Sequence, residues 1–413
     1  MPGAVSSLYD VTRLRATDLA RLSVSEAAAA VAPGGQTVSR RRVERIALTK
    51  IILITGSAGL VGSEAAVHFA GRGYRIVGVD NDLRRQFFGD AASTARNLVR
   101  LRERLGSIYT HVDADIRDVD GLADVFRAHC PRFRAIIHTA AQPSHDWATA
   151  EPHVDFAINA TGTLNLLELA RRHCPETPFI FTSTNKVYGD LSNGLPLVEH
   201  DTRLDLQPSH PLYHGIDETM SIDRSMHSLF GVSKTAADLM TQEYGRYFGM
   251  PTVCFRCGCI TGEHHAGAEQ HGFLAYLMKC AATASPYTVY GYAGKQVRDN
   301  IHGADLAAMF EAFIEAPRSA EVYNAGGARA NSCSLVEAVE LCQKISGTPM
   351  RVAHSGHVRA GDHKWWISDI RRFESHYPSW SLRWSLADVL RAMFQENRSQ
   401  WQREVASGAA VQP

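Results

Sequence analysis

The chain has 413 residues, of which 45% are hydrophobic and 8% aromatic, which suits one large α/β domain with a smaller lobe or two ordinary domains. Lysine plus arginine equals aspartate plus glutamate at 43 each, so no global charge favours nucleic acid or an anionic membrane as a partner. The sequence has no apolar run of about 18 residues that predicts a transmembrane helix, and no charged-then-apolar start typical of a secretion signal.

Residues 1–48 differ in composition from the rest of the chain. They contain an alanine run, a Pro-Gly-Gly break and three consecutive arginines. This composition predicts a flexible N-terminal extension, with an arm that contacts a second subunit as the alternative. A transit peptide is disfavoured because Asp10, Asp18 and Glu26 break its acid-poor pattern.

Short apolar runs alternate with helix-like stretches from residue 49 onward. The runs are "KIILITG", "YRIVGVD", "RAIIHTA", "PFIFTST" and "PTVCFR". This alternation predicts an α/β fold, a doubly wound parallel (Rossmann) sheet over 49–260 that is covered on both faces. The pattern is less regular after residue 260. We expect a smaller C-terminal substrate-binding lobe from 261–296 and 328–400, a strand returning to the sheet within 297–327 near "VYNAGG", and a tail at 401–413.

A glycine motif follows the first apolar run. "ILITGSAGLVGSEAA" spaces Gly56, Gly59 and Gly62 between a strand and a helix, which allows a pyrophosphate to approach the backbone and the helix N-terminus. Asp80 ends the next strand, where a carboxylate accepts hydrogen bonds from ribose hydroxyls and repels a 2′-phosphate. The motif therefore predicts NAD as cofactor, although Arg84 and Arg85 leave NADP open. The expected contacts are Gly56, Ala58, Gly59, Leu60, Val61, Gly62, Asp80 and Asn81, with Asp115 and Ile116 at the adenine.

The cysteines and histidines do not predict a metal site. Cys254 and Cys257 lie in a run that reads as a buried strand, so they should point to opposite faces and act as core thiols. His264, His265 and His271 suit a loop that closes over the ligand better than a zinc site. Eight scattered cysteines fit a reduced, cytoplasmic compartment.

Two later motifs carry a family resemblance. "FTSTNKVYGD" ends the fifth expected strand, and "HSLFGVSK" places Lys234 in a long helix. Together with the glycine motif they resemble the extended short-chain dehydrogenase/reductases, the NAD-dependent epimerase/dehydratase family, over roughly residues 49–395. That family uses a Ser or Thr, a Tyr and a Lys four residues later. Thr184 and Lys234 match by position, and Phe230 occupies the place of the tyrosine.

The resemblance also indicates a subclass. Asn185 and Lys186 stand where 4,6-dehydratases carry Asp and Glu, and where decarboxylases keep the Glu. "STNKVYGD" and "GKQVRDNIH" resemble the CDP-paratose 2-epimerases (CDP-tyvelose epimerases). This implies NAD-dependent epimerisation of a nucleotide-diphospho-sugar, most specifically at C2, through a keto-sugar. A 4-epimerase, a net oxidoreductase and a non-catalytic binding protein stay open as alternatives.

The expected site residues follow from the same resemblance. Arg298 and Arg359 suit diphosphate oxygens. The missing phenol requires another base, and the candidates are His227, Tyr213, Lys186 and Tyr188. The remaining substrate contacts implied are Gln142, Thr184, Asn185 and His271, and the remaining cofactor contacts implied are Thr139, Ala140, Ala141, Asn159, Thr182 and Lys234. The family also implies a homodimer in which helices near 154–173 and 231–248 form a four-helix bundle.

Overall fold

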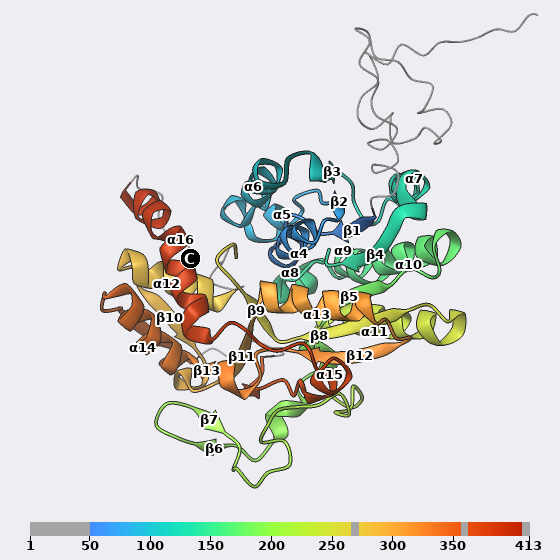
Figure 1. Cartoon of the computed structure of the whole chain (residues 1–413). Helices are drawn as coiled ribbons and strands as arrows, with labels where there is room; N and C mark the ends of the chain where they lie inside the picture. Colours follow the sequence, from blue (N-terminus) through green and yellow to red (C-terminus); the bar gives the residue numbers. More distant parts are fainter. Residues whose placement is uncertain (1–49, 266–271, 357–361, 407–413) are drawn as a thin grey trace, which may run out of the picture.

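The computed structural model describes residues 50–265, 272–356 and 362–406 (Figure 1). The expected N-terminal extension lies outside these residues. Within them, seven parallel strands form one sheet in the order β12-β8-β5-β4-β1-β2-β3, which confirms the doubly wound fold. The strands are β1 (Ile51–Thr55), β2 (Arg75–Val79), β3 (Tyr109–Val112), β4 (Phe133–His138), β5 (Phe179–Thr184), β8 (Thr252–Cys257) and β12 (Glu321–Ala325).

Helices cover both faces of this sheet, and each face has its own core. Alternate residues of β1 show the division, since Ile52 and Ile54 join one apolar cluster while Ile51 and Leu53 join the other. The first cluster packs against α4 (Leu60–Gly71), α6 (Ala95–Leu105), α13 (Gly303–Glu315) and α15 (Arg371–His376), and the second against α7 (Val119–His129), α10 (Gly162–His173) and α11 (Leu229–Phe248).

The cysteines follow the predicted alternation. Cys254 lies in one cluster and Cys257 in the other, on opposite faces of β8. All eight cysteines of the chain lie among the described residues, and all are free thiols. The core-thiol interpretation of this pair is confirmed.

The C-terminal lobe packs at one side of the sheet. Figure 1 shows its helices α12 (Phe273–Thr283), α14 (Leu335–Ser346) and α16 (Leu386–Ala406) grouped together beside β10 (Tyr287–Tyr290). β10 pairs in parallel with β14 (Val352–Ser355). The sequence predicted a tail from residue 401, but the helix α16 continues to Ala406 and Trp401 is buried in the lobe core. The lobe therefore extends beyond the expected boundary at residue 400.

A second small sheet joins the lobe to the Rossmann domain. Its central strand β11 (Val297–His302) pairs with β9 (Cys259–Thr261), β13 (Ser332–Ser334) and β15 (Trp365–Trp366). The strand that returns to the main sheet is β12, parallel to β8, as expected near "VYNAGG". Of the two strands in the segment 297–327, β12 belongs to the main sheet and β11 belongs to the small sheet.

Short elements complete the described chain. β6 (Val198–Glu199) and β7 (Leu204–Asp205) form an antiparallel pair, and α5 (Arg84–Phe88), α8 (His145–Ala150) and α9 (Pro152–Phe156) precede or follow strands of the main sheet. A π-helical turn at Ala157–Thr161 leads into α10. Among the described helices, none is both long and apolar enough to cross a membrane.

Candidate active site

A cavity of about 530 Å³ lies between the carboxyl ends of the central strands and the C-terminal lobe. Parallel sheets bind ligands at this edge. Many expected site residues line it: Gly56, Gly59, Leu60, Val61, Asp80, Asn81, Asp115, Ile116, Thr139, Ala140, Ala141, Thr184, Asn185, Lys186 and Arg298. His271 and Arg359 lie outside the described residues.

The glycine loop has the geometry of an anion cradle. Gly56 has φ +68°, and a Cβ there would lie 2.7 Å from the Ala140 nitrogen. A Cβ on Gly62 would lie 2.1 Å from the Gly56 carbonyl oxygen. Gly62 itself does not line the cavity among the described residues, so its contribution is to let α4 pack close to the loop. The first turn of α4 is thereby placed at the cavity wall, which fits a dinucleotide pyrophosphate.

Asp80 ties the loop to the end of β2. One carboxylate oxygen accepts a hydrogen bond from the Ala58 N–H at 2.9 Å, and the other accepts from the Asp82 N–H at 2.9 Å. Ala58 therefore contributes by positioning Asp80, and it is not among the described lining residues. Burial raises the pKa of the Asp80 carboxyl. A ribose hydroxyl that donates a hydrogen bond to this carboxyl would act in the opposite direction, because it stabilises the charged form.

Two lysines flank the end of β5, of which Lys234 is buried and Lys186 is half-buried. The Lys234 Nζ donates to the Thr182 carbonyl oxygen at 2.9 Å and lies 4.1 Å from the centroid of the Phe181 ring. Thr182 thus holds Lys234 through its backbone, and neither residue is among the described lining residues. The Thr184 hydroxyl accepts from the Lys186 N–H at 3.2 Å, which fixes the turn that carries Lys186. Burial lowers the pKa of each lysine to about 8.

Phe230 lines the cavity at the position where the resemblance expects tyrosine. It is the second residue of α11, whose N-terminus is capped by Ser228, which accepts from the Gly231 N–H at 3.1 Å. The Phe230 ring lies 4.9 Å, centroid to centroid, from the His145 ring, which also lines the cavity. His145 was missed in the sequence because it follows β4 in a stretch without a motif.

The four candidate bases differ in whether they reach the cavity. Among the described residues, Lys186 is the one of the four that lines the cavity. Tyr188 is buried and its hydroxyl donates to the Asn324 side-chain oxygen at 2.8 Å, while burial raises its pKa. Tyr213 lies under the Arg329 guanidinium, 3.7 Å from its ring centroid, and His227 Nε2 lies 2.7 Å from the Val187 carbonyl oxygen. Tyr188, Tyr213 and His227 are therefore not among the described lining residues, whereas Lys186 is.

Two residues expected to contact ligands, Gln142 and Asn159, are buried behind the cavity lining. The Gln142 amide donates to the Ser144 carbonyl oxygen and to an Asp155 carboxylate oxygen, both at 2.8 Å. The Asn159 amide donates to the Gln142 carbonyl oxygen at 3.0 Å and to the Ser233 hydroxyl at 3.1 Å. These side-chain amides donate within the protein, and neither residue is among the described lining residues, so the structure shows them positioning the loop beside the cavity.

Arg298 lies on the lobe side of the cavity. One guanidinium nitrogen donates to the Val297 carbonyl oxygen at 2.9 Å, and another lies 3.9 Å from an Asp362 carboxylate oxygen. Asp362 also lines the cavity and was not expected from the sequence. This loose ion pair leaves guanidinium donors available for a phosphate.

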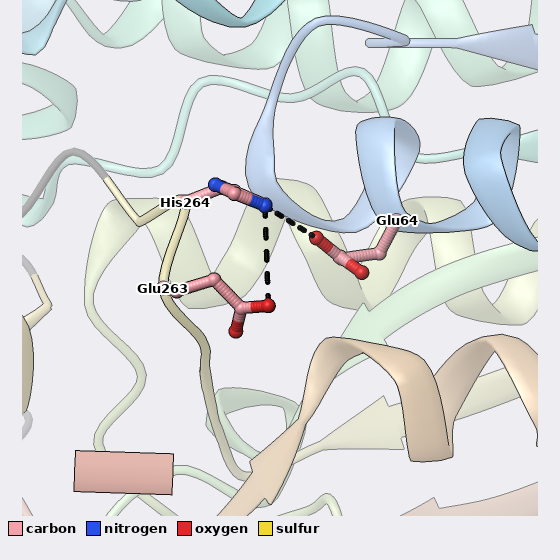
Figure 2. A group of neighbouring side chains, drawn as sticks. All are labelled: Glu64, Glu263 and His264. Carbon is pink, nitrogen blue, oxygen red and sulfur yellow. Dashed lines mark ion pairs between the residues drawn. The ribbon is translucent and has the colours of Figure 1, made fainter. Parts of the chain in front are cut away.

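A charged cluster joins α4 to the loop after β9. Figure 2 shows His264 between Glu64 and Glu263, with its Nε2 3.9 Å from an oxygen of each carboxylate. Glu263 also contacts His302 at 2.8 Å, and Arg100 lies 3.9 Å from Glu64. Glu64, Glu263 and His264 are close enough to hold a cation. Arg100 already faces Glu64 and His302 is hydrogen-bonded to Glu263, so contacts within the protein account for the cluster.

The Rossmann sheet, the glycine cradle and the acidic end of β2 define a dinucleotide-binding protein whose cavity extends to residues of the lobe. The NAD dependent epimerase/dehydratase family matches residues 52–326, and the chain belongs to this family. Its cofactor is therefore NAD, as the sequence predicted.

The chain is also similar to individual epimerases. The chain is 30% identical to a CDP-paratose 2-epimerase of Salmonella typhi, over 83% of this chain and 98% of that protein. It is 27% identical to UDP-glucose 4-epimerase 1 of Oryza sativa subsp. japonica, over 84% and 94%. Among solved structures, UDP-glucuronic acid 4-epimerase from Bacillus cereus, in complex with UDP-glucuronic acid and NAD, matches with a TM-score of 0.65 at 25% identity, over 85% and 99%.

Proposed function

We propose that the protein epimerises a nucleotide-diphospho-sugar reversibly at C2 through a transient keto-sugar. The observation that carries this proposal is the residue pair after Thr184. Asn185 and Lys186 line the cavity where an eliminating enzyme needs a carboxylic acid and a carboxylate. An amide and an ammonium can bind a sugar and stabilise a carbonyl oxygen, but they do not form an acid–base pair for removing water. The similarity to the CDP-paratose 2-epimerase supports C2 as the reacting carbon.

Each part of the cavity has a role in this reaction. The bound NAD supplies a group that takes up and returns a hydride. The glycine loop and Asp80 hold the pyrophosphate and ribose, and Lys234 is proposed to position the nicotinamide end from its anchor on Thr182. Thr184 and Lys186 face the sugar, and Arg298 holds the diphosphate.

Phe230 favours one alternative from another class, a protein that binds NAD and a nucleotide sugar without turnover. Loss of the phenol removes the family's proton acceptor, which is worth about 10²–10⁴-fold in rate. Within enzymes, a 4-epimerase or a net oxidoreductase on a similar substrate is the alternative, and it would use the same cavity.

One screen separates these functions. Purified protein with NAD is incubated with CDP-, UDP-, dTDP- and GDP-linked hexoses, including CDP-paratose, and the products are resolved by NMR and mass spectrometry. An inverted C2 isomer without net NADH supports the proposal, and inversion at C4 indicates a 4-epimerase. Net NADH indicates an oxidoreductase, while thermal stabilisation by ligand without conversion indicates a binding protein.

We also propose a homodimer and a cytoplasmic location. Leu164 of α10 and Leu239 of α11 are partly exposed, at 36% and 39% of their surface, and Phe248 is exposed at the end of α11. These apolar side chains support pairing of the two helices with a second copy. The free thiols support a reducing compartment.

A further inference from the structure

The cavity needs a proton acceptor beside Phe230. The Phe230 ring is 7% exposed and lines the cavity where the family's phenol would stand. A phenyl ring keeps the packing but has no atom that can take or give a proton. Oxidation of a sugar hydroxyl at this wall therefore requires another group within reach.

His145 lies at the required place. Its ring packs against Phe230 at 4.9 Å with an interplanar angle of 52°, and both rings line the same cavity. Imidazole exchanges protons near neutral pH more readily than other side chains. His145 comes from α8, so it reaches the phenol position from a different element than the motif that lost the tyrosine.

The surrounding structure holds His145 in place. Ser144 caps α8 by accepting from the Trp147 N–H at 3.1 Å, so His145 occupies a fixed first turn. The Gln142 amide braces the same loop, and Asn159 links it to Ser233 on α11. The loop that carries His145 and the helix that carries Phe230 are thus tied together by buried hydrogen bonds.

Lys186 fits a different role in the cavity. Burial is the main cause that lowers the pKa of Lys186, while on the lobe side Asp362 raises this pKa and Arg298 lowers it. With a pKa of about 8, it is mostly an ammonium at pH 7, and an ammonium has no lone pair with which to accept a proton. Lys186 is thus suited to stabilising negative charge on the sugar or diphosphate.

We propose that His145 is the catalytic acid–base that replaces the family's tyrosine; this inference rests on the proposed epimerase function. In the oxidising step the O–H bond of the sugar hydroxyl breaks and an N–H bond forms on His145, while the electron pair of the C–H bond passes to the NAD that the family chemistry supplies. In the return step His145 gives the proton back as the C–H bond re-forms on the other face. No proton or electron is consumed over the cycle.

The test uses His145→Gln, Phe230→Tyr and the double variant, with His153→Gln as control because His153 is exposed on α9. On whichever sugar nucleotide of the screen the wild type converts, His145→Gln should lower kcat by about 10²-fold or more. KM and the calorimetric affinity for NAD should change little. Adding Phe230→Tyr to His145→Gln should restore at least about tenfold of the rate, because the phenol returns to its family position. His153→Gln should behave as wild type.

A second readout does not depend on turnover. In histidine-labelled protein, the NMR titration of His145, assigned by its loss in His145→Gln, should shift in Phe230→Tyr because a hydroxyl is placed next to the imidazole. An unchanged titration, an active His145→Gln, or a wild type that is inactive while Phe230→Tyr is active would each overturn the role of His145. Inactivity of both wild type and Phe230→Tyr on the whole panel would instead overturn the proposed function, and the inference with it.

Discussion

At the scale of single residues, Lys186 gives the cavity a charge that depends on pH. Its pKa of about 8 lies below the ordinary lysine value because burial disfavours the ammonium. The ammonium is present below this pKa and is lost as the pH rises through it. An anionic ligand favours the ammonium, so its binding must weaken as the pH passes above about 8.

The measurement is calorimetry of CDP-glucose and UDP-glucose binding between pH 6.5 and 9.5, roughly spanning the pKa. Wild type should lose affinity above about pH 8, whereas Lys186→Met should bind more weakly throughout and show a flatter profile. A wild-type affinity that rises with pH would show that the Lys186 ammonium does not hold the ligand.

Asp80 should decide between the two nicotinamide cofactors. Its carboxylate anchors Ala58 and Asp82 at the end of β2, where a 2′-phosphate would meet negative charge. NAD should bind at least tenfold more tightly than NADP to wild type, and Asp80→Ala should reduce this preference because both repulsion and ribose hydrogen bonds are lost. Equal affinity of wild type for both cofactors would show that Arg84, which also lines the cavity, outweighs Asp80.

Arg298 should separate the two ligand sites. Replacing it with Ala should weaken nucleotide-sugar binding by about 2–4 kcal/mol, the range for truncating one member of a buried charge pair. NAD affinity should change little, since Arg298 lies on the lobe side of the cavity. Loss of NAD binding in the same titration would mean that Arg298 supports the fold and does not hold the diphosphate.

At the scale of elements, the glycines of α4 provide a matched pair. Gly62→Ala would place a methyl group 2.1 Å from the Gly56 carbonyl oxygen, while Gly71→Ala at the end of the same helix has nothing within 4 Å. Gly62→Ala should abolish measurable NAD binding and lower Tm, and Gly71→Ala should leave both within error. Calorimetry and thermal unfolding of the two variants side by side would reveal any general intolerance of α4 to alanine, which would contradict the cradle.

The elements themselves were largely readable from the sequence, whereas their contacts were not. Runs of β-branched residues predict the strands, because their signal is local in the sequence. The nucleotide loop is likewise predicted by the spacing of Gly56 and Gly62 and by Asp80 at the end of the next strand. The contact of His145 with Phe230 joins α8 to α11, and no local pattern reports it. The contact of Tyr213 with Arg329 is hidden from the sequence for the same reason, because the two residues are distant in the chain. Nor does the sequence show that the Gln142 backbone N–H donates to the Asn159 side-chain oxygen while the Asn159 amide donates to the Gln142 carbonyl oxygen.

At the scale of the whole molecule, α10 and α11 should form the dimer interface. Light scattering at micromolar concentration should give about twice the 45.4 kDa chain mass. The double variant Leu164→Asp/Leu239→Asp should dissociate the homodimer, because charges would be buried at the interface. A matched change at Val405, which is also partly exposed but lies on α16, should leave the mass unchanged. A wild-type mass of one chain would refute the interface.

In the proposed reaction, one cavity oxidises C2 of a nucleotide sugar and reduces the same carbon from the other face. The most direct test follows a nucleotide sugar, chosen from those the wild type converts, that carries deuterium at C2. We expect an inverted product that retains the deuterium at C2, with no net NADH and no exchange with solvent. Inversion with loss of the deuterium to solvent, or deuterium retained at C2 without inversion there, would contradict it.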